Sequence, residues 1–153
     1  MKRRSARSRR SVWKYGGPER LGMLAEFTII GAPVSQKNRK IIMRSAKGKL
    51  FIGSDPRVAE WKNSAVLQIR SQWGCGSPLV GPLRIDLVVY QGARQRLDGD
   101  NAIAGALDAL EAAGVVANDY QFEQGSWTRR RDADDPRIEI QIWDIIRSQD
   151  RAQ

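Results

Sequence analysis

Carboxylates are the most informative residues of this sequence, because they gather in one stretch of a chain that is otherwise basic. Asp98 and Asp100 stand two residues apart in the segment RLDGDN, and from Asp98 to Glu123 there are six acids and no base. A turn at Gly99 can point both carboxylates to the same side, and we expect the chain to return Asp119 to that edge after the next helix. Three hard oxygen ligands at an open edge predict a Mg²⁺ site, and Mn²⁺ accepts the same ligands.

Several other kinds of catalytic site are excluded by what the sequence lacks. There is no histidine, which removes Ser-His-Asp and Cys-His catalysis and every metal site with histidine ligands. Cys75 is the only cysteine, so the chain forms neither an intrachain disulfide nor a thiolate cluster for zinc. The remaining chemistry must use carboxylates, lysine, hydroxyls or a hard metal ion.

Ordinary structural roles stay open for these acids. An acid at a helix start is commonly a cap or a partner of the helix dipole, and an Asn118 followed by Asp119 is typical of a turn. Asp108 lies eight residues after Asp100, which is about 12 Å along a helix. It therefore cannot ligate the same ion, and we expect it to form a surface ion pair or an indirect contact with the site.

Basic residues flank the acidic stretch and favour a polyanionic partner. The formal charge is +9, and Lys37, Asn38, Arg39 and Lys40 lie in a loop that can contact DNA phosphates. The segment from 37 to 49 holds six basic residues and no acid. One face of the hairpin expected there is predicted to be strongly positive, although such a run is often only a solvated face.

The first 22 residues carry much of the positive charge, with eight bases and one acid. Their Arg, Ser and Gly content and their lack of apolar periodicity predict a disordered tail over 1–22. This tail is a nucleic-acid arm that adds affinity without sequence choice, a solvated extension, or a segment upstream of a translation start at Met23. We expect the folded domain at 23–146 and a short C-terminal tail at 147–153.

Hydrophobic periodicity predicts one compact domain of the α+β or mixed α/β class, in which two main helices pack on a mixed sheet. Strands are expected at Glu26–Ile30, Lys40–Met43, Leu50–Ile52, Leu83–Tyr90, Phe122–Arg129 and Arg137–Trp143, and helices at Pro56–Trp73 and at 100–113.

The second helix is the element that positions the acids. Asp100 or Asn101 is expected to cap it, and the spacing of Ile103, Leu107 and Leu110 predicts its buried stripe. No apolar run approaches the roughly 18 to 20 residues that cross a bilayer, and no apolar stretch of a signal peptide follows the basic N-terminus. We therefore expect a cytoplasmic protein with no membrane partner and no small-molecule cofactor.

Together, these motifs resemble those of the RusA-like Holliday junction resolvases, which are endodeoxyribonucleases common in phages and prophages. The similarity spans most of Phe27 to Trp143. It rests on PVSQKNRK after the first strand, DGDN at the second helix, DAL within it, AAGVV at its end, and ND at Asn118 and Asp119. This combination at this spacing is much more specific than any of its parts.

The resemblance implies that Asp98, Asp100 and Asp119 are the essential acids and that they bind Mg²⁺ at the cleavage site. It also implies a homodimer that places two such sites across a four-way DNA junction and nicks two strands of like polarity. The setting that it implies is DNA recombination and repair in a bacterial or phage-infected cell.

One position departs from the family pattern. The family has a functionally important lysine four residues after the second acid of DxDN, and this chain has Ala104 there. A cation near the scissile phosphate then has to come from elsewhere, with Arg94, Arg96, Lys37 and Lys40 as candidates. Two alternatives to a nuclease therefore stay open: a catalytically weakened protein that holds branched DNA without cutting it, and an adaptor that uses the tail alone.

Overall fold

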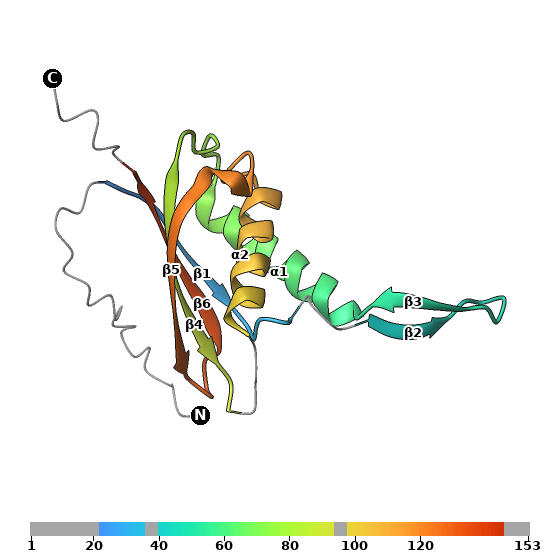
Figure 1. The fold of residues 1–153 in the computed structure, drawn as a ribbon. Coiled ribbons are helices and arrows are strands. Elements are labelled where there is room, and N and C mark those ends of the chain that lie inside the picture. The colour runs from blue at the N-terminus through green and yellow to red at the C-terminus, as the bar shows by residue number, and fades with distance from the viewer. Residues whose placement is uncertain (1–21, 36–39, 94–97, 146–153) are drawn as a thin grey trace, which may run out of the picture.

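Four strands form one mixed sheet, and two helices cover one of its faces (Figure 1). The computed structural model describes residues 22–35, 40–93 and 98–145. In chain order the elements are β1 (Met23–Ile30), β2 (Lys40–Arg44), β3 (Leu50–Ser54), α1 (Pro56–Trp73), β4 (Leu83–Gln91), α2 (Gly99–Ala112), the short 3₁₀ helix η1 (Asp119–Gln121), β5 (Phe122–Arg131) and β6 (Arg137–Asp144).

The strand order in the sheet is β1-β6-β4-β5. Strand β6 runs antiparallel to both β1 and β4, whereas β4 and β5 are parallel. A parallel pair needs a crossover connection, and α2 supplies it. The predicted class, one domain with a mixed sheet and two main helices, is confirmed, and all six predicted strands are present.

The core lies between the sheet and the helices and is built from alternate residues of the strands. Ile138, Ile140 and Ile142 of β6 are fully buried, as their spacing predicted. The side chains of β4 that face the same way, from Leu83 to Val89, are at most 4% exposed. Each such side chain contributes about 1.5–3 kcal/mol to stability through burial. The central strands β4 and β6 are therefore firmly anchored in the core.

Small side chains bring α2 onto the sheet, instead of the aliphatic stripe predicted from its sequence. Ala102 and Ala106 are 2% and 0% exposed, whereas Ile103 and Leu107 are only partly buried. Small residues allow the helix backbone to approach the strands closely, which leaves the larger side chains at the margin of the contact. The predicted stripe is therefore correct only for Leu110, which is fully buried.

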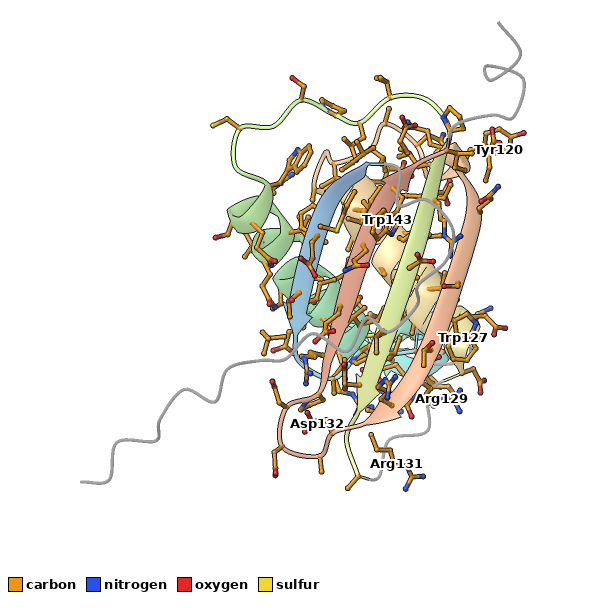
Figure 2. The ribbon with its side chains drawn as sticks, turned by 90° about the vertical axis from the view of Figure 1, so that its left-hand side faces the viewer. Tyr120, Trp127, Arg129, Arg131, Asp132 and Trp143 are labelled. Atoms are coloured by element: carbon orange, nitrogen blue, oxygen red, sulfur yellow. The ribbon has the colours of Figure 1, made fainter. Side chains whose placement is uncertain are left out.

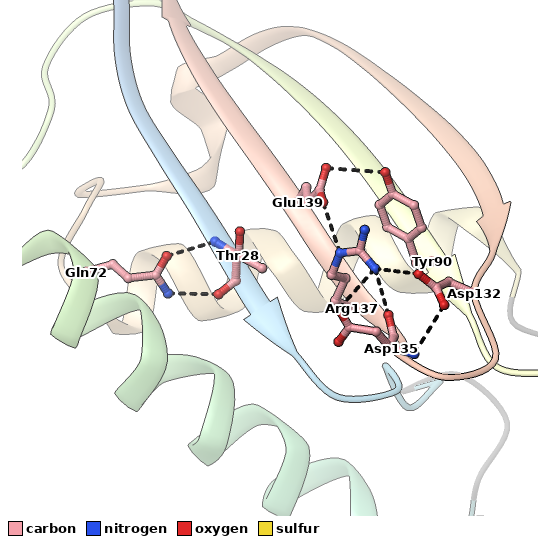
Figure 3. Close-up of polar contacts among 7 residues, drawn as sticks. All are labelled: Thr28, Gln72, Tyr90, Asp132, Asp135, Arg137 and Glu139. Carbon is pink, nitrogen blue, oxygen red and sulfur yellow. Dashed lines mark hydrogen bonds and ion pairs between the residues drawn. The ribbon is translucent and has the colours of Figure 1, made fainter. Parts of the chain in front are cut away.

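Two glutamines of α1 close the outer edge of β1. Gln68 accepts a hydrogen bond from the Ile30 amide at 2.8 Å and donates to the Ile30 carbonyl at 3.0 Å. Gln72 forms the same pair of bonds with Thr28, both at 2.8 Å (Figure 3). An open strand edge is a template for pairing with another chain, and these side-chain amides occupy that template on β1.

A buried arginine braces the connection between β5 and β6 (Figure 3). The Arg137 guanidinium bonds to Asp132 at 2.9 Å and to Glu139 at 3.0 Å, and it lies 3.7 Å from the centre of the Tyr90 ring. The hydrogen bond from Arg137 lowers the pKa of Asp132, and burial together with the charge of Glu139 raises the pKa of Tyr90. This network fixes the C-terminal end of β5 against β4 and β6.

The hairpin of β2 and β3 stands away from the sheet and the helices (Figure 1). Ile42 pairs with Ile52, and Gly48 takes a φ of 79° in the turn, as expected for this hairpin. Ile42 and Ile52 are 77% and 71% exposed, and strand alternation puts them between Lys40 and Arg44 on one face. The predicted strongly positive face is therefore mixed, with aliphatic side chains between the basic ones.

Both predicted tails, 1–22 apart from Gly22 and 147–153, lie outside the described residues. Within the part of the chain that is described, none of the helices has the length and apolar character to span a membrane.

Candidate metal and nucleic-acid site

Two carboxylates stand at the N-terminal end of α2. Asp98 is the N-cap residue, Asp100 lies in the first turn, and both are exposed; we call these two residues the acid pair. The cap was predicted at Asp100 or Asn101, so it lies two or three residues earlier than expected. Among the described residues, the Asp98 side chain makes no capping hydrogen bond. Its carboxylate therefore remains available to a ligand.

Gly99 brings the start of α2 into direct contact with β5. Its backbone is helical and not left-handed, so the conformational freedom expected of this glycine is not what the structure uses. A Cβ at Gly99 would lie 2.2 Å from ring atoms of Trp127, far inside any normal contact. Only glycine therefore lets the Trp127 ring lie against the backbone between the two acids.

A cation, Arg129, lies over the Trp127 ring at the start of α2. The Arg129 guanidinium carbon lies 5.5 Å from the centre of the Trp127 ring, and Figure 2 shows the two side chains together on β5. In the sheet register, Trp127 pairs with Leu87 and Arg129 with Val89, so both side chains share the face that the helices cover. Sequence reasoning missed Arg129; its only local signal is the two-residue spacing from Trp127 on a strand.

Asp119 lies at the opposite end of α2. It begins η1, where Asn118 forms a capping box, and its amide donates to the Glu111 carboxylate at 3.2 Å. Glu111 follows Asp98 by thirteen residues, which is about 20 Å along a helix. The expectation that a single chain returns Asp119 to the acid pair is therefore wrong. Within the described residues, no three or more acidic or cysteine side chains are grouped closely enough to hold a metal ion.

The other predicted site residues divide into placed and unplaced ones. Asp108 pairs with Lys62 at 3.8 Å on the surface, as predicted, and such an exposed pair contributes little to stability. Lys40 is exposed at the start of β2. The remaining predicted DNA contacts lie outside the described residues: Lys37, Asn38, Arg39, Arg94 and Arg96.

Comparison with known proteins decides the family. Residues 31–143 match the family described as Endodeoxyribonuclease RusA. This chain belongs to the RusA family. A curated relative, the Crossover junction endodeoxyribonuclease RusA of Aquifex aeolicus (strain VF5), is 33% identical over 94 residues, which cover 61% of this chain and 71% of the relative. The resemblance inferred from the motifs is confirmed.

The region matched to the RusA family contains the acid pair, Asp119, Trp127 and Arg129. It also contains Ala104, which is partly buried and lies one turn along α2 from Asp100. Its methyl side chain has no charge and cannot form an ion pair with a phosphate. Any cation that serves the acid pair must come from an element other than α2, whose sequence holds no lysine or arginine.

The donors at the start of α2 suit a hard divalent cation. Mg²⁺ is commonly held by one or two carboxylates together with water and substrate phosphate oxygens, so the acid pair is the part of such a site that a single chain supplies. Asn101, 6% exposed, adds an Oδ1 atom that has no hydrogen-bond partner among the described residues. Buried polar atoms are normally satisfied. A metal ion nearby, or a water molecule bound to it, would give the Asn101 Oδ1 atom a partner.

Proposed function

We propose that this chain is a Mg²⁺-dependent endodeoxyribonuclease that cuts four-way DNA junctions in recombination and repair, with Mn²⁺ as an alternative ion. The observation that carries the proposal is the acid pair, two exposed carboxylates at a helix start in a chain of the RusA family. The name of the relative, a crossover junction endodeoxyribonuclease, supports the choice of substrate.

The chain's own residues have separate tasks in this proposal. When bound, Mg²⁺ supplies activation of a water for attack on phosphorus and stabilisation of the departing oxygen. Asp98 and Asp100, at the start of α2, would hold the ion. The Trp127 ring covers the backbone at Gly99, which limits movement of the turn that carries the two carboxylates.

Asp119 can join the acid pair only if a second copy of the chain supplies it. We propose a homodimer in which the α2 helices of the two copies run in opposite directions, so that the C-terminal end of one lies beside the N-terminal end of the other. Two-fold symmetry then builds two equal sites, one for each of two DNA strands. Ile103 and Leu107, partly buried on α2, would add apolar contact to such an interface.

Basic residues around the site would position the DNA through its phosphates, reading shape more than sequence. Lys40 is exposed at the base of the hairpin. The same role is proposed for the residues that flank the hairpin and the acid pair in sequence: Lys37, Asn38, Arg39, Arg94 and Arg96.

A nicking assay on a synthetic four-way junction tests the proposed function. Wild type should cut with Mg²⁺ or Mn²⁺ and stop with EDTA, and Asp100→Asn should not cut in any buffer. Asp108→Asn is the matched control, because it removes an exposed acid of the same helix that pairs with Lys62, and it should cut like wild type. Intact junction persisting equally in all samples would remove the catalytic claim.

Ala104 favours a second candidate, a protein that binds branched DNA without cutting it. Junction binding that survives EDTA, with no product at any Mg²⁺ or Mn²⁺ concentration, would support that candidate. Deletion of residues 1–22 tests a third candidate, an adaptor that binds DNA through the tail alone. The adaptor should lose its DNA affinity after this deletion, whereas a nuclease should still cut.

A further inference from the structure

The last three residues of β5 are arginines, and the sheet register divides them between two faces. Arg129 pairs with Val89, whose side chain lies in the core, so Arg129 shares the face that the helices cover. Arg130 pairs with Tyr90 on the open face, where its charge acts on the Tyr90 hydroxyl. Two neighbouring residues with the same charge therefore serve opposite sides of the sheet.

Contact with α2 determines where the Arg129 charge lies. The Trp127 ring rests against Gly99, between the two acids, and the Arg129 guanidinium lies over that ring at 5.5 Å. A guanidinium is well suited to binding phosphate oxygens, and a cation over an aromatic ring is held there by the ring's electrostatic attraction. The indole thus connects the start of α2, where the acid pair stands, to the guanidinium of Arg129.

The acid pair has an electrostatic need for such a group. Asp98 and Asp100 bring two negative charges to the place where a DNA phosphate must lie, and α2 contains no lysine or arginine to offset them. The resemblance to the family implies a lysine four residues after Asp100, and this chain has Ala104 there. Oriented positive charge aimed at a reacting phosphate is commonly among the largest contributions to such chemistry.

We propose that Arg129 binds the DNA phosphate at the acid pair and takes the place of the lysine that is missing at Ala104, an inference that rests on the proposed function. Trp127 is the positioning residue of this arrangement, because it holds Arg129 against the start of α2. Arg130 has no part in it.

The salt dependence of junction binding tests the contact without any cutting. The plot of log K against log salt concentration has a negative slope, and each phosphate neutralised by a protein cation on duplex DNA adds about 0.9 to its magnitude. In EDTA, Arg129→Ala should lower the magnitude of the slope for a four-way junction by about one unit. Arg130→Ala, the control with the same charge change on the other face, should leave the slope at the wild-type value.

Single-turnover cutting gives the second measurement. Arg129→Ala should slow cutting by at least about tenfold at saturating protein, Arg129→Lys should fall between this variant and wild type, and Arg130→Ala should match wild type. The double variant Ala104→Lys/Arg129→Ala should recover much of the rate, because it returns a cation to the first turns of α2. Thermal unfolding of each variant controls for loss of fold.

The outcomes separate this inference from the function on which it rests. Equal slopes and equal rates for Arg129→Ala and Arg130→Ala would overturn the role of Arg129 and leave the nuclease standing. A wild type that never cuts, combined with a lower slope for Arg129→Ala alone, would remove the nuclease and keep the phosphate contact.

Discussion

Two helices of this protein begin with an aspartate at the N-cap, and the two aspartates are used differently. Asp55, before α1, is 5% exposed; it accepts a hydrogen bond from the Arg57 amide at 3.0 Å and pairs with the Arg57 guanidinium at 2.7 Å, which raises the pKa of Arg57. Asp98, before α2, is exposed and makes no side-chain capping bond among the described residues. The Asp55 carboxylate stabilises the start of its helix, whereas the Asp98 carboxylate is exposed to solvent.

The difference shows how a binding site can be recognised in a common structural position. A side-chain N-cap is typically worth about 1 kcal/mol, and α2 forgoes that stabilisation at Asp98. Because α2 is held instead by the close packing of its small side chains on the sheet, it does not depend on the cap. The carboxylate is thereby left to a ligand.

Loss of the Asp98 charge should have the largest effect. Asp98→Asn keeps the shape of the side chain and removes a proposed metal ligand, so cutting of a four-way junction should fall by about 100-fold or more. The midpoint of thermal unfolding should stay within about 2 °C of wild type, since no capping bond is lost. Lower stability with unchanged cutting would instead make Asp98 a cap like Asp55.

Mixing variants sharpens the contrast between the two ends of α2. Asp100→Asn and Asp119→Asn should each be inactive alone, and their mixture should regain cutting at about a quarter of the wild-type sites, because half of the randomly formed dimers are mixed and each has one intact site. The product should be nicked and not resolved. A mixture of Asp98→Asn with Asp100→Asn is the control and should stay inactive; recovery there, or none in the first mixture, would refute shared sites.

The packing that supports Asp98 can be disturbed without touching a carboxylate. Gly99→Ala forces a methyl group into the Trp127 ring, so we expect a loss of about 1–3 kcal/mol in unfolding free energy and slower cutting. Adding Trp127→Leu should recover part of the stability. Gly92→Ala is the control, because its Cβ would meet no atom within 4 Å; equal effects of both alanines in urea unfolding would contradict this packing.

Asp55 should give the smallest effect on function. Asp55→Ala removes the capping bond to the Arg57 amide and should lower the unfolding free energy by about 0.5–2 kcal/mol. The folded fraction should cut a junction at the wild-type rate, measured well below the unfolding temperature. Cutting that falls further than the folded fraction would show that the start of α1 also belongs to the site.

Local signals in the sequence were sufficient to predict the elements and the acid pair. Apolar alternation predicted β4 and β6, and Asp55 followed by Pro56 predicted the start of α1, because these signals depend on neighbours within a few residues. The same signals put Asp98 and Asp100 at a helix start, and their motif context indicated the RusA family.

Contacts between distant segments decided the rest. The length of α2 separates Asp119 from the acid pair, and the parallel pairing of β4 with β5 brings Trp127 and Arg129 to Gly99. Neither follows from local spacing, because the direction in which a chain returns after a helix is set by which faces pack together and not by the residues of the turn. The sequence alone thus determined which acids stand at the helix start, and the tertiary structure decided which residues join them.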